Sequence, residues 1–517
     1  MTVEVAPGAP RPSPVAGHIR GSTLLLVGRV AAQALELGAQ ILLVRYLSME
    51  DYGAFSYALA AALLFKSVAM FGLPDTLARY IPLYRERGRY DALLGSLRLG
   101  FGAVLGLGLL LAAGVVVGVH WLGVRPIDDQ RALTLLAILA LLIPLEAVDG
   151  LLTALYATLG DARTIFLRQA LVPALRFALV VGMIALGADV VFLTLGYLAI
   201  SLVGAAIYGG LFGRLVRGQA RDWPAAPRRR AYPVREIFTF AVPMLTTALI
   251  WILMESSDVL LLGHFRDADA VATFRAVAPV ARLNQGVIVN FAILFTPLAS
   301  RLYARGDRDG LGALYGQTAL WVTVLTFPIF ALTGALAGPL TVGLFGARYA
   351  DATPLMALLS LGYFFQTALG FNGLTLKVCK KLRYSVAIDS TAAVLNIAIN
   401  LALIPSYGAR GAAVGTATTL VVHNLLKQYG LWRYTGITLF HRRYLAAYGA
   451  VAAVALALVG VEALWHLTFW LALPVGAAAS LLVLWGSRGA LDVAAIFPEI
   501  DRWPLVRLVL QPLLRAP

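Results

Sequence analysis

The sequence predicts an all-α protein that crosses a membrane about fourteen times. Of its 517 residues, 60% are hydrophobic and only 13% are charged, and the mean hydropathy is +0.80. Soluble globular proteins are about a quarter charged, so this composition excludes that class. Fourteen apolar segments of roughly 18–28 residues are each long enough to cross a hydrocarbon core about 30 Å thick. The third observation is that the basic residues alternate between the two sides of this ladder of segments.

The basic residues set the predicted orientation. Of the 42 Lys and Arg, 31 fall in the termini and the even-numbered connections, 6 in the odd-numbered connections and 5 inside segments. Cytoplasmic loops carry such an excess of Lys and Arg. We therefore predict a multi-pass protein of the inner (cytoplasmic) membrane with both termini in the cytosol. The net charge of +15 then reflects loops that face anionic lipid, and no separate basic domain indicates a nucleic-acid partner.

The predicted membrane segments form two lobes and an appended pair. The N-lobe, 21–213, contains six segments, at 22–46, 52–74, 93–120, 132–158, 165–187 and 190–213. The C-lobe, 236–434, contains six more, at 236–263, 270–299, 312–336, 353–376, 384–404 and 411–434. An extra helix pair within 435–487 has segments at 444–463 and 467–486. The remaining parts are a polar cytosolic tail, a basic cytosolic linker and an amphipathic cytosolic tail, at 1–20, 214–235 and 488–517.

Three features of the chain exclude other classes. The first apolar run carries Arg29 and Glu36 and lacks a small-residue cleavage pattern, so we predict a retained helix and not a signal peptide. The single cysteine, Cys379, excludes an intrachain disulfide and has no partners for a metal site; no cofactor is predicted. The odd-numbered connections are short, the longest being about nine residues around Gly123–Arg131. They leave little room for the catalytic side chains of a membrane enzyme such as an O-antigen ligase or polymerase, so no enzyme is predicted.

The two halves of the chain resemble each other. The stretch from Glu36 to Phe55 aligns without gaps on the stretch from Glu255 to Phe274, at an offset of 219 residues. A second match pairs 160–163 with 380–383, each between the fourth and fifth segment of its half. Six segments per half is an even number, so both copies enter the membrane with the same polarity. We therefore predict parallel repeats related by an axis along the membrane normal.

Polar side chains inside the segments lie on shared helix faces, as a spacing of 100° per residue shows. They are Arg29, Gln33, Glu36 and Gln40 on the first helix, Lys66 on the second, Thr247, Trp251, Glu255 and Asp258 on the seventh, Arg275, Arg282 and Asn290 on the eighth, Ser385, Asp389, Asn396 and Asn400 on the eleventh, and Thr416, Thr419, His423 and Lys427 on the twelfth. One interpretation is that these residues pair with one another in a packed bundle. On that interpretation Arg79, Arg168 and Lys427 reach the membrane interface from helix ends. The other interpretation, which the continuous polar stripes favour, is a water-filled cavity between two lobes.

The charge of the predicted cavity indicates its cargo. Guanidinium and ammonium groups bind phosphate through charge-assisted hydrogen bonds, and a low dielectric strengthens that attraction. A cationic cavity suits an anionic cargo such as a phosphate or pyrophosphate head group. The predicted substrate-binding residues are Arg29, Lys66, Arg79, Arg275, Arg282, Gln33, Gln40 and Asn290. The predicted acidic companions, which either neutralise the arginines or bind a coupling H⁺ or Na⁺, are Glu36, Glu255, Asp258 and Asp389.

Three short motifs carry a family resemblance. They run from Arg45 to Phe55 (Arg-Tyr-Leu-Ser-Met-Glu-Asp-Tyr-Gly-Ala-Phe), from Gly72 to Arg79, and from Asp258 to Gly263. In these stretches the chain resembles a polysaccharide-export, O-antigen-type oligosaccharide flippase of the multidrug/oligosaccharidyl-lipid/polysaccharide exporter superfamily. The resemblance extends over the first twelve helices. It implies two six-helix lobes that work by alternating access.

The resemblance also implies a substrate and partners. The cargo would be an undecaprenyl-pyrophosphate-linked oligosaccharide moved from the inner to the outer leaflet for polysaccharide or lipopolysaccharide biosynthesis, beside glycosyltransferases and a polysaccharide polymerase. By position, Arg29, Lys66 and either Arg275 or Arg282 would hold the pyrophosphate. Fourteen helices are similar to the lipid II flippase branch as well, in which the extra pair contributes to a groove for the lipid tail. A multidrug cation antiporter of the same fold is a further alternative, but it would favour an acidic cavity.

Overall fold

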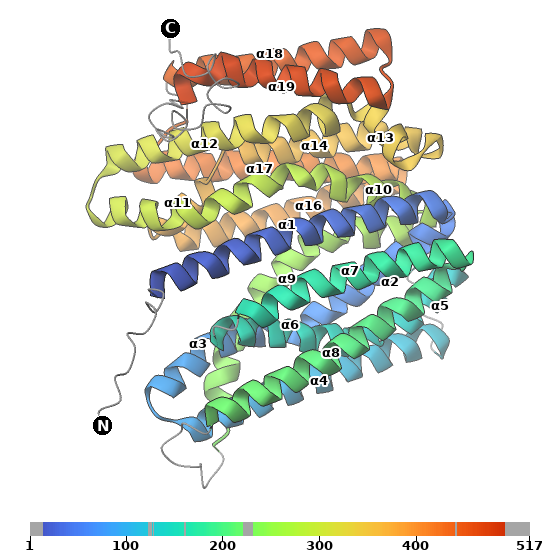
Figure 1. The fold of residues 1–517 in the computed structure, drawn as a ribbon, viewed down its shortest axis with the longest axis vertical. Helices are drawn as coiled ribbons and strands as arrows, with labels where there is room; N and C mark the ends of the chain where they lie inside the picture. The colour runs from blue at the N-terminus through green and yellow to red at the C-terminus, as the bar shows by residue number, and fades with distance from the viewer. Residues whose placement is uncertain are drawn as a thin grey trace, which may run out of the picture. The chain divides into compact units, whose positions relative to one another are not determined.

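A computed structural model describes residues 14–121, 127, 129–159, 162–220, 231–439 and 442–491, and these residues form helices without any β-strand. Residues 1–13 of the predicted tail 1–20, residues 221–230 of the predicted linker 214–235 and residues 492–517 of the predicted amphipathic tail lie outside the described residues. The helices, drawn in Figure 1, are α1 Pro14–Tyr46, α2 Met49–Met70, α3 Leu73–Glu86, α4 Tyr90–His120, α5 Gln130–Leu139, α6 Leu142–Leu159, α7 Ala162–Leu186, α8 Val190–Ala220, α9 Val234–Phe265, α10 Ala268–Arg282, η1 Leu283–Gln285, α11 Gly286–Ala304, α12 Arg308–Phe330, η2 Ala331–Ala335, α13 Ala337–Phe345, η3 Ala347–Ala352, α14 Thr353–Ala368, α15 Asn372–Val378, α16 Leu382–Tyr407, α17 Ala409–Thr435, α18 Arg442–Trp465 and α19 Phe469–Leu491.

The all-helical membrane class predicted from the sequence is confirmed. Ten helical stretches among the described residues are long and apolar enough to cross a bilayer, or eleven if the bent pair Ala268–Ala292 and Leu294–Ala304 is one span. Every predicted segment overlaps at least one helix. The count of fourteen crossings stays a prediction, because length and apolar composition do not select α1, α9 or α17.

Several segments that the sequence predicts as single runs are broken, and local chemistry explains each break. Phe71 and Gly72 take φ of 49° and 66° between α2 and α3. Pro144 has no N–H to give to the Ala140 carbonyl, which instead accepts from Ile143 at 3.1 Å, and the chain turns between α5 and α6. Positive φ at Gly370 separates α14 from α15. Apolar length alone does not register such interruptions.

One odd-numbered connection was predicted wrongly. Residues 337–352 connect the ninth and tenth predicted segments, and this connection is longer than the nine residues expected as the maximum for odd-numbered connections. In the structure they fold into α13 and η3. Tyr349 of η3 is buried, and Phe345 packs against its ring at 6.1 Å. The connection is therefore a packed helical element.

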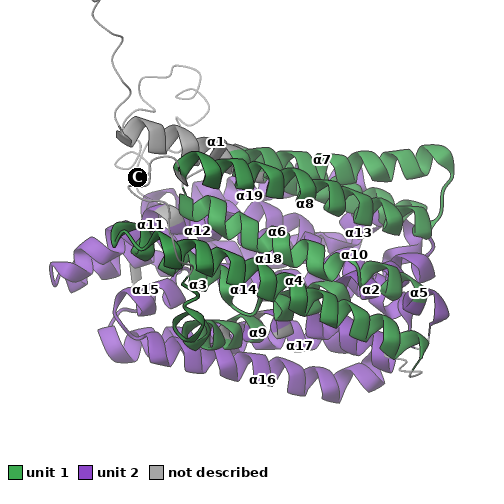
Figure 2. Cartoon of the chain, turned by 90° about the horizontal axis from the view of Figure 1, so that it is seen from below, with its two compact units in different colours: residues 1–46, 61–124, 134–249 green, residues 47–60, 125–133, 250–517 purple. Residues whose placement is uncertain are grey.

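The described chain divides into two compact units, coloured in Figure 2. Unit 1 is residues 1–46, 61–124 and 134–249, and unit 2 is residues 47–60, 125–133 and 250–517. The division falls inside α2, α5 and α9. The first turns of α2 and the first residues of α5 therefore pack with the C-terminal half. The lobe boundaries predicted from the sequence stay a prediction.

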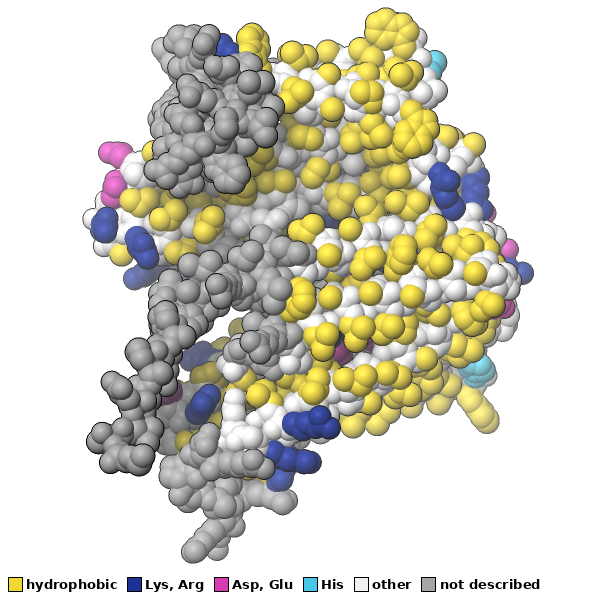
Figure 3. All heavy atoms as spheres, viewed as in Figure 1, with side chains coloured by type: hydrophobic (Ala, Val, Ile, Leu, Met, Phe, Trp, Pro, Cys, Tyr) yellow, Lys and Arg dark blue, Asp and Glu magenta, His cyan; other side chains and the backbone are white. Residues whose placement is uncertain are grey.

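Unit 1 is built around α6. This helix packs against α3, α4, α7 and α8, and α1 lies along α7. Gly28 and Gly38 of α1 face Phe166 and Phe177 of α7, so small residues let the two helices approach. On the outside, α4, α7 and α8 expose apolar side chains, of which Leu110 is 68% exposed, and Figure 3 shows this yellow surface. Such a surface is stable in lipid and not in water.

Unit 2 has its core among α12, η2, α14, α18 and α19. Phe327 and Phe330 of α12 pack on Phe364 of α14, with stacked rings 4.3 Å apart for Phe330 and Phe364. The extra helix pair, α18 and α19, places Val483 in this core and exposes Trp470 to 77% on its other side. The pair is thus an integral part of unit 2.

The ends of helices recur at the offset that the sequence repeat predicts. Adding 219 to one position gives its counterpart in three cases: Tyr46 and Phe265, Met49 and Ala268, and Val190 and Ala409. The first pair ends α1 and α9, the second begins α2 and α10, and the third begins α8 and α17. The two halves therefore share these three element boundaries at the predicted offset, although paired helices such as α2 and α10, with 22 and 15 residues, differ in length.

Candidate functional site

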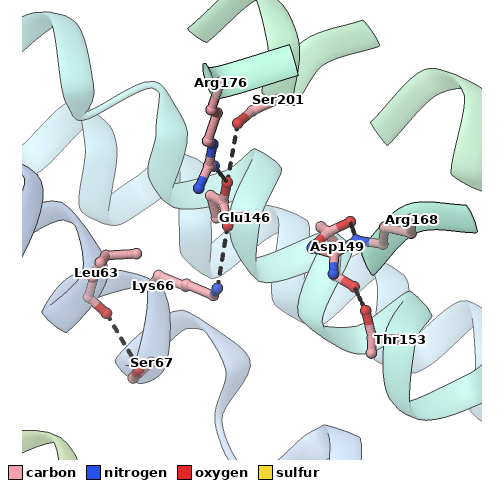
Figure 4. Close-up of polar contacts among 9 residues, drawn as sticks. All are labelled: Leu63, Lys66, Ser67, Glu146, Asp149, Thr153, Arg168, Arg176 and Ser201. Atoms are coloured by element: carbon pink, nitrogen blue, oxygen red, sulfur yellow. Dashed lines mark hydrogen bonds and ion pairs between the residues drawn. The ribbon is translucent and has the colours of Figure 1, made fainter. Parts of the chain in front are cut away.

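Three donors from three helices converge on one carboxylate inside unit 1 (Figure 4). Glu146 of α6 accepts from Lys66 Nζ of α2 at 3.3 Å and from an Arg176 terminal nitrogen of α7 at 2.9 Å. Ser201 Oγ of α8 donates to the same carboxylate at 3.0 Å. A carboxylate in a membrane helix is costly unless paired, and here it is shared by two cations.

A second ion pair lies on the same helices. Asp149, one turn along α6 from Glu146, accepts from Arg168 Nε at 2.7 Å, and an Arg168 terminal nitrogen pairs with its other oxygen. This is a bidentate pair, the strongest arrangement for an arginine and a carboxylate. Arg168 therefore binds inside unit 1, and the prediction that it extends to the membrane interface is wrong.

Unit 2 contains a cluster of oxygen ligands around Asp258 of α9, which is 4% exposed. Thr416 Oγ1 of α17 donates to one carboxylate oxygen at 2.7 Å, and the Asn400 amide of α16 donates to the other. Asn396 lies one turn away, 3.3 Å from the Asn400 nitrogen, and also accepts from Ser257 at 3.0 Å. The carbonyl oxygen of Asn400 is buried without a hydrogen-bond partner among the described residues. Carboxylate, amide and hydroxyl oxygens are the ligands of hard cations.

A second acidic site of unit 2 lies between α16 and α17. Asp389 accepts from Lys427 Nζ at 2.8 Å and lies 2.8 Å from His423 Nε2. The Lys427 side chain is only 12% exposed, so the prediction that it reaches the membrane interface is wrong. The predicted charge-balancing residue Asp389 thus has both partners, Lys427 and His423, on the twelfth predicted helix. Its ion pair with Lys427 was not predicted.

The predicted cationic residues lie in different surroundings. Lys66 belongs to the Glu146 cluster. Arg79 of α3 is exposed, with its guanidinium 4.5 Å from the Phe240 ring centroid. Arg275 and Arg282 lie two turns apart on α10; Arg275 is half-buried, and Arg282 is exposed beside Tyr363 at 5.9 Å. The side chain of Arg29 lies outside the described residues.

The other predicted site residues also lie in different surroundings. Gln33 and Glu36 of α1 are exposed and Gln40 is half-buried. The Asn290 amide donates to Gly286 of its own helix at 3.1 Å. The side chain of Glu255 lies outside the described residues. The structure therefore unites Asp258 and Asp389 with predicted neighbours, and Lys66 with a residue that was not predicted.

Sequence reasoning missed Glu146, Asp149, Arg176 and Ser201. A signal was present, because Glu146 and Asp149 are two acids one turn apart in an apolar run. Arg168 and Arg176 are likewise two bases two turns apart on the next predicted segment. The faces could not be paired without knowing how α6 and α7 rotate against each other.

Comparisons with known proteins agree with this fold. A membrane protein of Methanocaldococcus jannaschii, the uncharacterized MJ1068, is 22% identical over 430 residues, which are 80% of this chain and 83% of that protein. The structure is similar to the lipid II flippase MurJ in an inward closed conformation, with a TM-score of 0.68, 14% identity and coverage of 94% of this chain and 100% of that one. It is also similar to an inward-facing multidrug-resistance transporter of the MATE family in the MOP superfamily, with a TM-score of 0.62, 15% identity and coverage of 80% and 98%.

These structural likenesses, at low identity, establish a shared fold. The sequence evidence is more specific, because the profile of the family described as polysaccharide biosynthesis protein matches residues 18–303. That range is more than half of the 517 residues, and it contains the three motifs that carry the resemblance. This multi-pass membrane chain therefore belongs to the polysaccharide biosynthesis protein family.

Proposed function

We propose that this protein is a flippase that moves an undecaprenyl-pyrophosphate-linked oligosaccharide from the inner to the outer leaflet of the cytoplasmic membrane by alternating access. The observation that supports it most is the presence of basic side chains well inside membrane helices of both units. Lys66 and Arg176 lie in unit 1 and Arg275 in unit 2. Basic groups at this depth are expensive, and a pyrophosphate cargo gives them a function.

The sugar-lipid cargo fits the family, whose description is polysaccharide biosynthesis protein. The proposed pyrophosphate ligands remain the five basic residues Lys66, Arg29, Arg79, Arg275 and Arg282. Glycosyltransferases and a polysaccharide polymerase are the proposed partners, since they would supply the lipid-linked unit and consume it. We place both termini in the cytosol from the distribution of Lys and Arg.

The export assay tests the proposed arginines. In a strain lacking the gene, Arg275→Ala and Arg282→Ala each abolish surface polysaccharide while the protein stays in the membrane, because each removes a cationic contact of the head group. The matched control is Arg301→Ala, an exposed arginine in the last turn of α11, which retains export. Wild-type export by both α10 variants would rule out these ligands.

The Asp258 cluster is the proposed coupling site for Na⁺ or H⁺. Its oxygen ligands come from α9, α16 and α17, so occupancy by a cation would link three helices. In proteoliposomes, Asp258→Asn removes the dependence of flipping on the ion gradient. Flipping that persists in Na⁺-free buffer with a pH gradient identifies H⁺ as the ion, and the opposite result identifies Na⁺.

Lipid II is the second candidate cargo. The MurJ likeness covers 94% of this chain, so it extends into the α18–α19 pair, whereas the MATE likeness covers 80%. Both cargoes carry a pyrophosphate, and a reconstituted assay with each fluorescent lipid in turn separates them. Efflux of a cationic dye without movement of either lipid would favour the antiporter alternative.

A further inference from the structure

The Glu146 carboxylate marks a point where donors of three kinds meet. An ammonium from α2, a guanidinium from α7 and a hydroxyl from α8 all reach it within 3.3 Å. Such a set of donors is what binds phosphate oxygens in proteins, with the guanidinium giving planar, paired hydrogen bonds. The carboxylate therefore occupies the position that another oxyanion would take.

One N–H group of Arg176 makes no hydrogen bond among the described residues. Its Nε is buried and has no hydrogen-bond partner among the described residues, while one terminal nitrogen binds Glu146. The Tyr197 ring lies 4.8 Å from the guanidinium and holds it in place through a cation–π contact. A buried unpaired N–H is destabilising, so an added acceptor would relieve that cost.

The neighbouring arginine shows the contrast. Arg168, two turns away on α7, uses Nε and a terminal nitrogen on the two oxygens of Asp149. In that pair the arginine Nε has its acceptor. At Glu146 one carboxylate serves two cations, and the Lys66 and Arg176 side chains keep 22% and 26% of their surface exposed. Arg168 keeps the same 26% exposed, so the unused Nε of Arg176, and not exposure, distinguishes the Glu146 cluster.

The charges around the cluster are close to balance. Glu36 of α1 lies within electrostatic range of Arg176, and it is exposed. An arriving anion would therefore have to exchange places with a carboxylate that is already bound.

We propose that Lys66, Arg176 and Ser201 form an oxyanion site that Glu146 fills while no ligand is bound, and that the phosphate or diphosphate of the cargo displaces Glu146. This inference rests on the proposed function and adds Arg176 and Ser201 to its ligands. The displaced carboxylate loses two ion pairs, so ligand binding loosens α6 from α2 and α7. The site thereby couples head-group binding to helix packing in unit 1.

Direct binding tests the exchange. Full-length protein in phosphatidylcholine nanodiscs is titrated with inorganic pyrophosphate and with farnesyl pyrophosphate, and the heat is measured. Arg176→Gln lowers the affinity for both by about tenfold or more, since a hydrogen bond to a charged group is worth at least that factor. Glu146→Gln raises the affinity, by about tenfold, because a neutral amide competes less well for the two cations.

The matched control is the double variant Arg168→Gln with Asp149→Asn, which removes the neighbouring ion pair of α6 and α7 without changing the net charge near Glu146. It changes neither affinity by more than about twofold, the scatter expected of a site that is not a ligand. Each variant is compared with the wild type by size exclusion and thermal unfolding. Where Arg176→Gln unfolds because Glu146 is left unpaired, the double variant with Glu146→Gln removes both charges and must still bind more weakly than Glu146→Gln alone.

The outcomes separate this site from the proposed function. Unchanged pyrophosphate affinity in both Arg176→Gln and Glu146→Gln overturns the oxyanion site, even if Arg275→Ala abolishes export and the flippase stands. Binding of farnesyl pyrophosphate but not inorganic pyrophosphate, lost in Arg176→Gln, identifies a lipid head group as the source of the phosphate. Equal loss of both in that variant identifies the phosphate groups alone as the recognised element.

Discussion

Single glycines decide how closely the elements of unit 2 approach at the start of α2. A Cβ built on Gly53 would lie 1.8 Å from the carbonyl oxygen of Ala268 and 2.5 Å from its carbon. Contacts below 3.0 Å to a backbone atom cannot be relieved by a side-chain rotation. Gly53 belongs to the first motif of the family resemblance. The close contact with Ala268 explains why the motif has glycine at this position.

Replacing Gly53 by alanine is expected to destabilise the protein. The added methyl forces the α2 and α10 backbones apart, and overpacking of this kind costs about 1–3 kcal/mol. Gly102→Ala on α4 is the control, because a Cβ there meets no atom within 4 Å. Thermal unfolding in detergent measures both. A Tm of Gly53→Ala equal to that of Gly102→Ala would contradict the close contact.

Some polar residues that the sequence singled out inside membrane segments meet across helices in the structure, although helical spacing did not indicate which helices they join. Asp258 contacts Asn400 and Thr416, and Asp389 lies beside His423. Glu146 was missed because its partners lie on three other helices. One-dimensional spacing contains no information about how those helices are rotated.

The caps at the N-termini of α2 and α10 repeat between the two halves of the chain. Ser48 precedes α2 and accepts from the Asp51 amide at 3.0 Å, and Asp267 precedes α10 and accepts from the Ala270 amide at 2.7 Å. The two caps stand at the repeat offset of 219 residues. The breaks within apolar runs were not predicted, since they depend on single residues such as Pro144 and Gly370.

Removing either cap is expected to lower stability by a similar amount. Ser48→Ala and Asp267→Ala each leave an amide of the first turn unsatisfied, at a cost of about 1 kcal/mol. In Tm this is a fall of roughly 1–3 °C for a chain of this size. Ser390→Ala serves as the control, because its hydroxyl only donates to Val386 of its own helix at 3.0 Å. A Tm for either cap variant equal to that of the control would show that the cap contributes nothing.

The predicted orientation of the chain rests on the distribution of Lys and Arg, and labelling of introduced cysteines tests it against one native thiol. Cys379 lies between α15 and α16, 4% exposed. Burial raises the pKa of its thiol, which Lys381 and Arg308 offset only in part. Because the thiolate is the reactive form, Cys379 is expected to react slowly with a maleimide at neutral pH. The native chain should therefore give little maleimide labelling of its own when cysteines are introduced elsewhere.

Two introduced cysteines then test the predicted topology in intact cells. Thr468→Cys lies in the odd-numbered connection between α18 and α19, and Ala304→Cys ends α11 beside an even-numbered connection; both positions are exposed. The excess of Lys and Arg in the even connections predicts that this side faces the cytosol. A membrane-impermeant maleimide should therefore label Thr468→Cys in intact cells, and Ala304→Cys only after permeabilisation. Labelling in the reverse order would invert the topology and place both termini outside, whereas equal labelling of both would mean that residues 304 and 468 share one side.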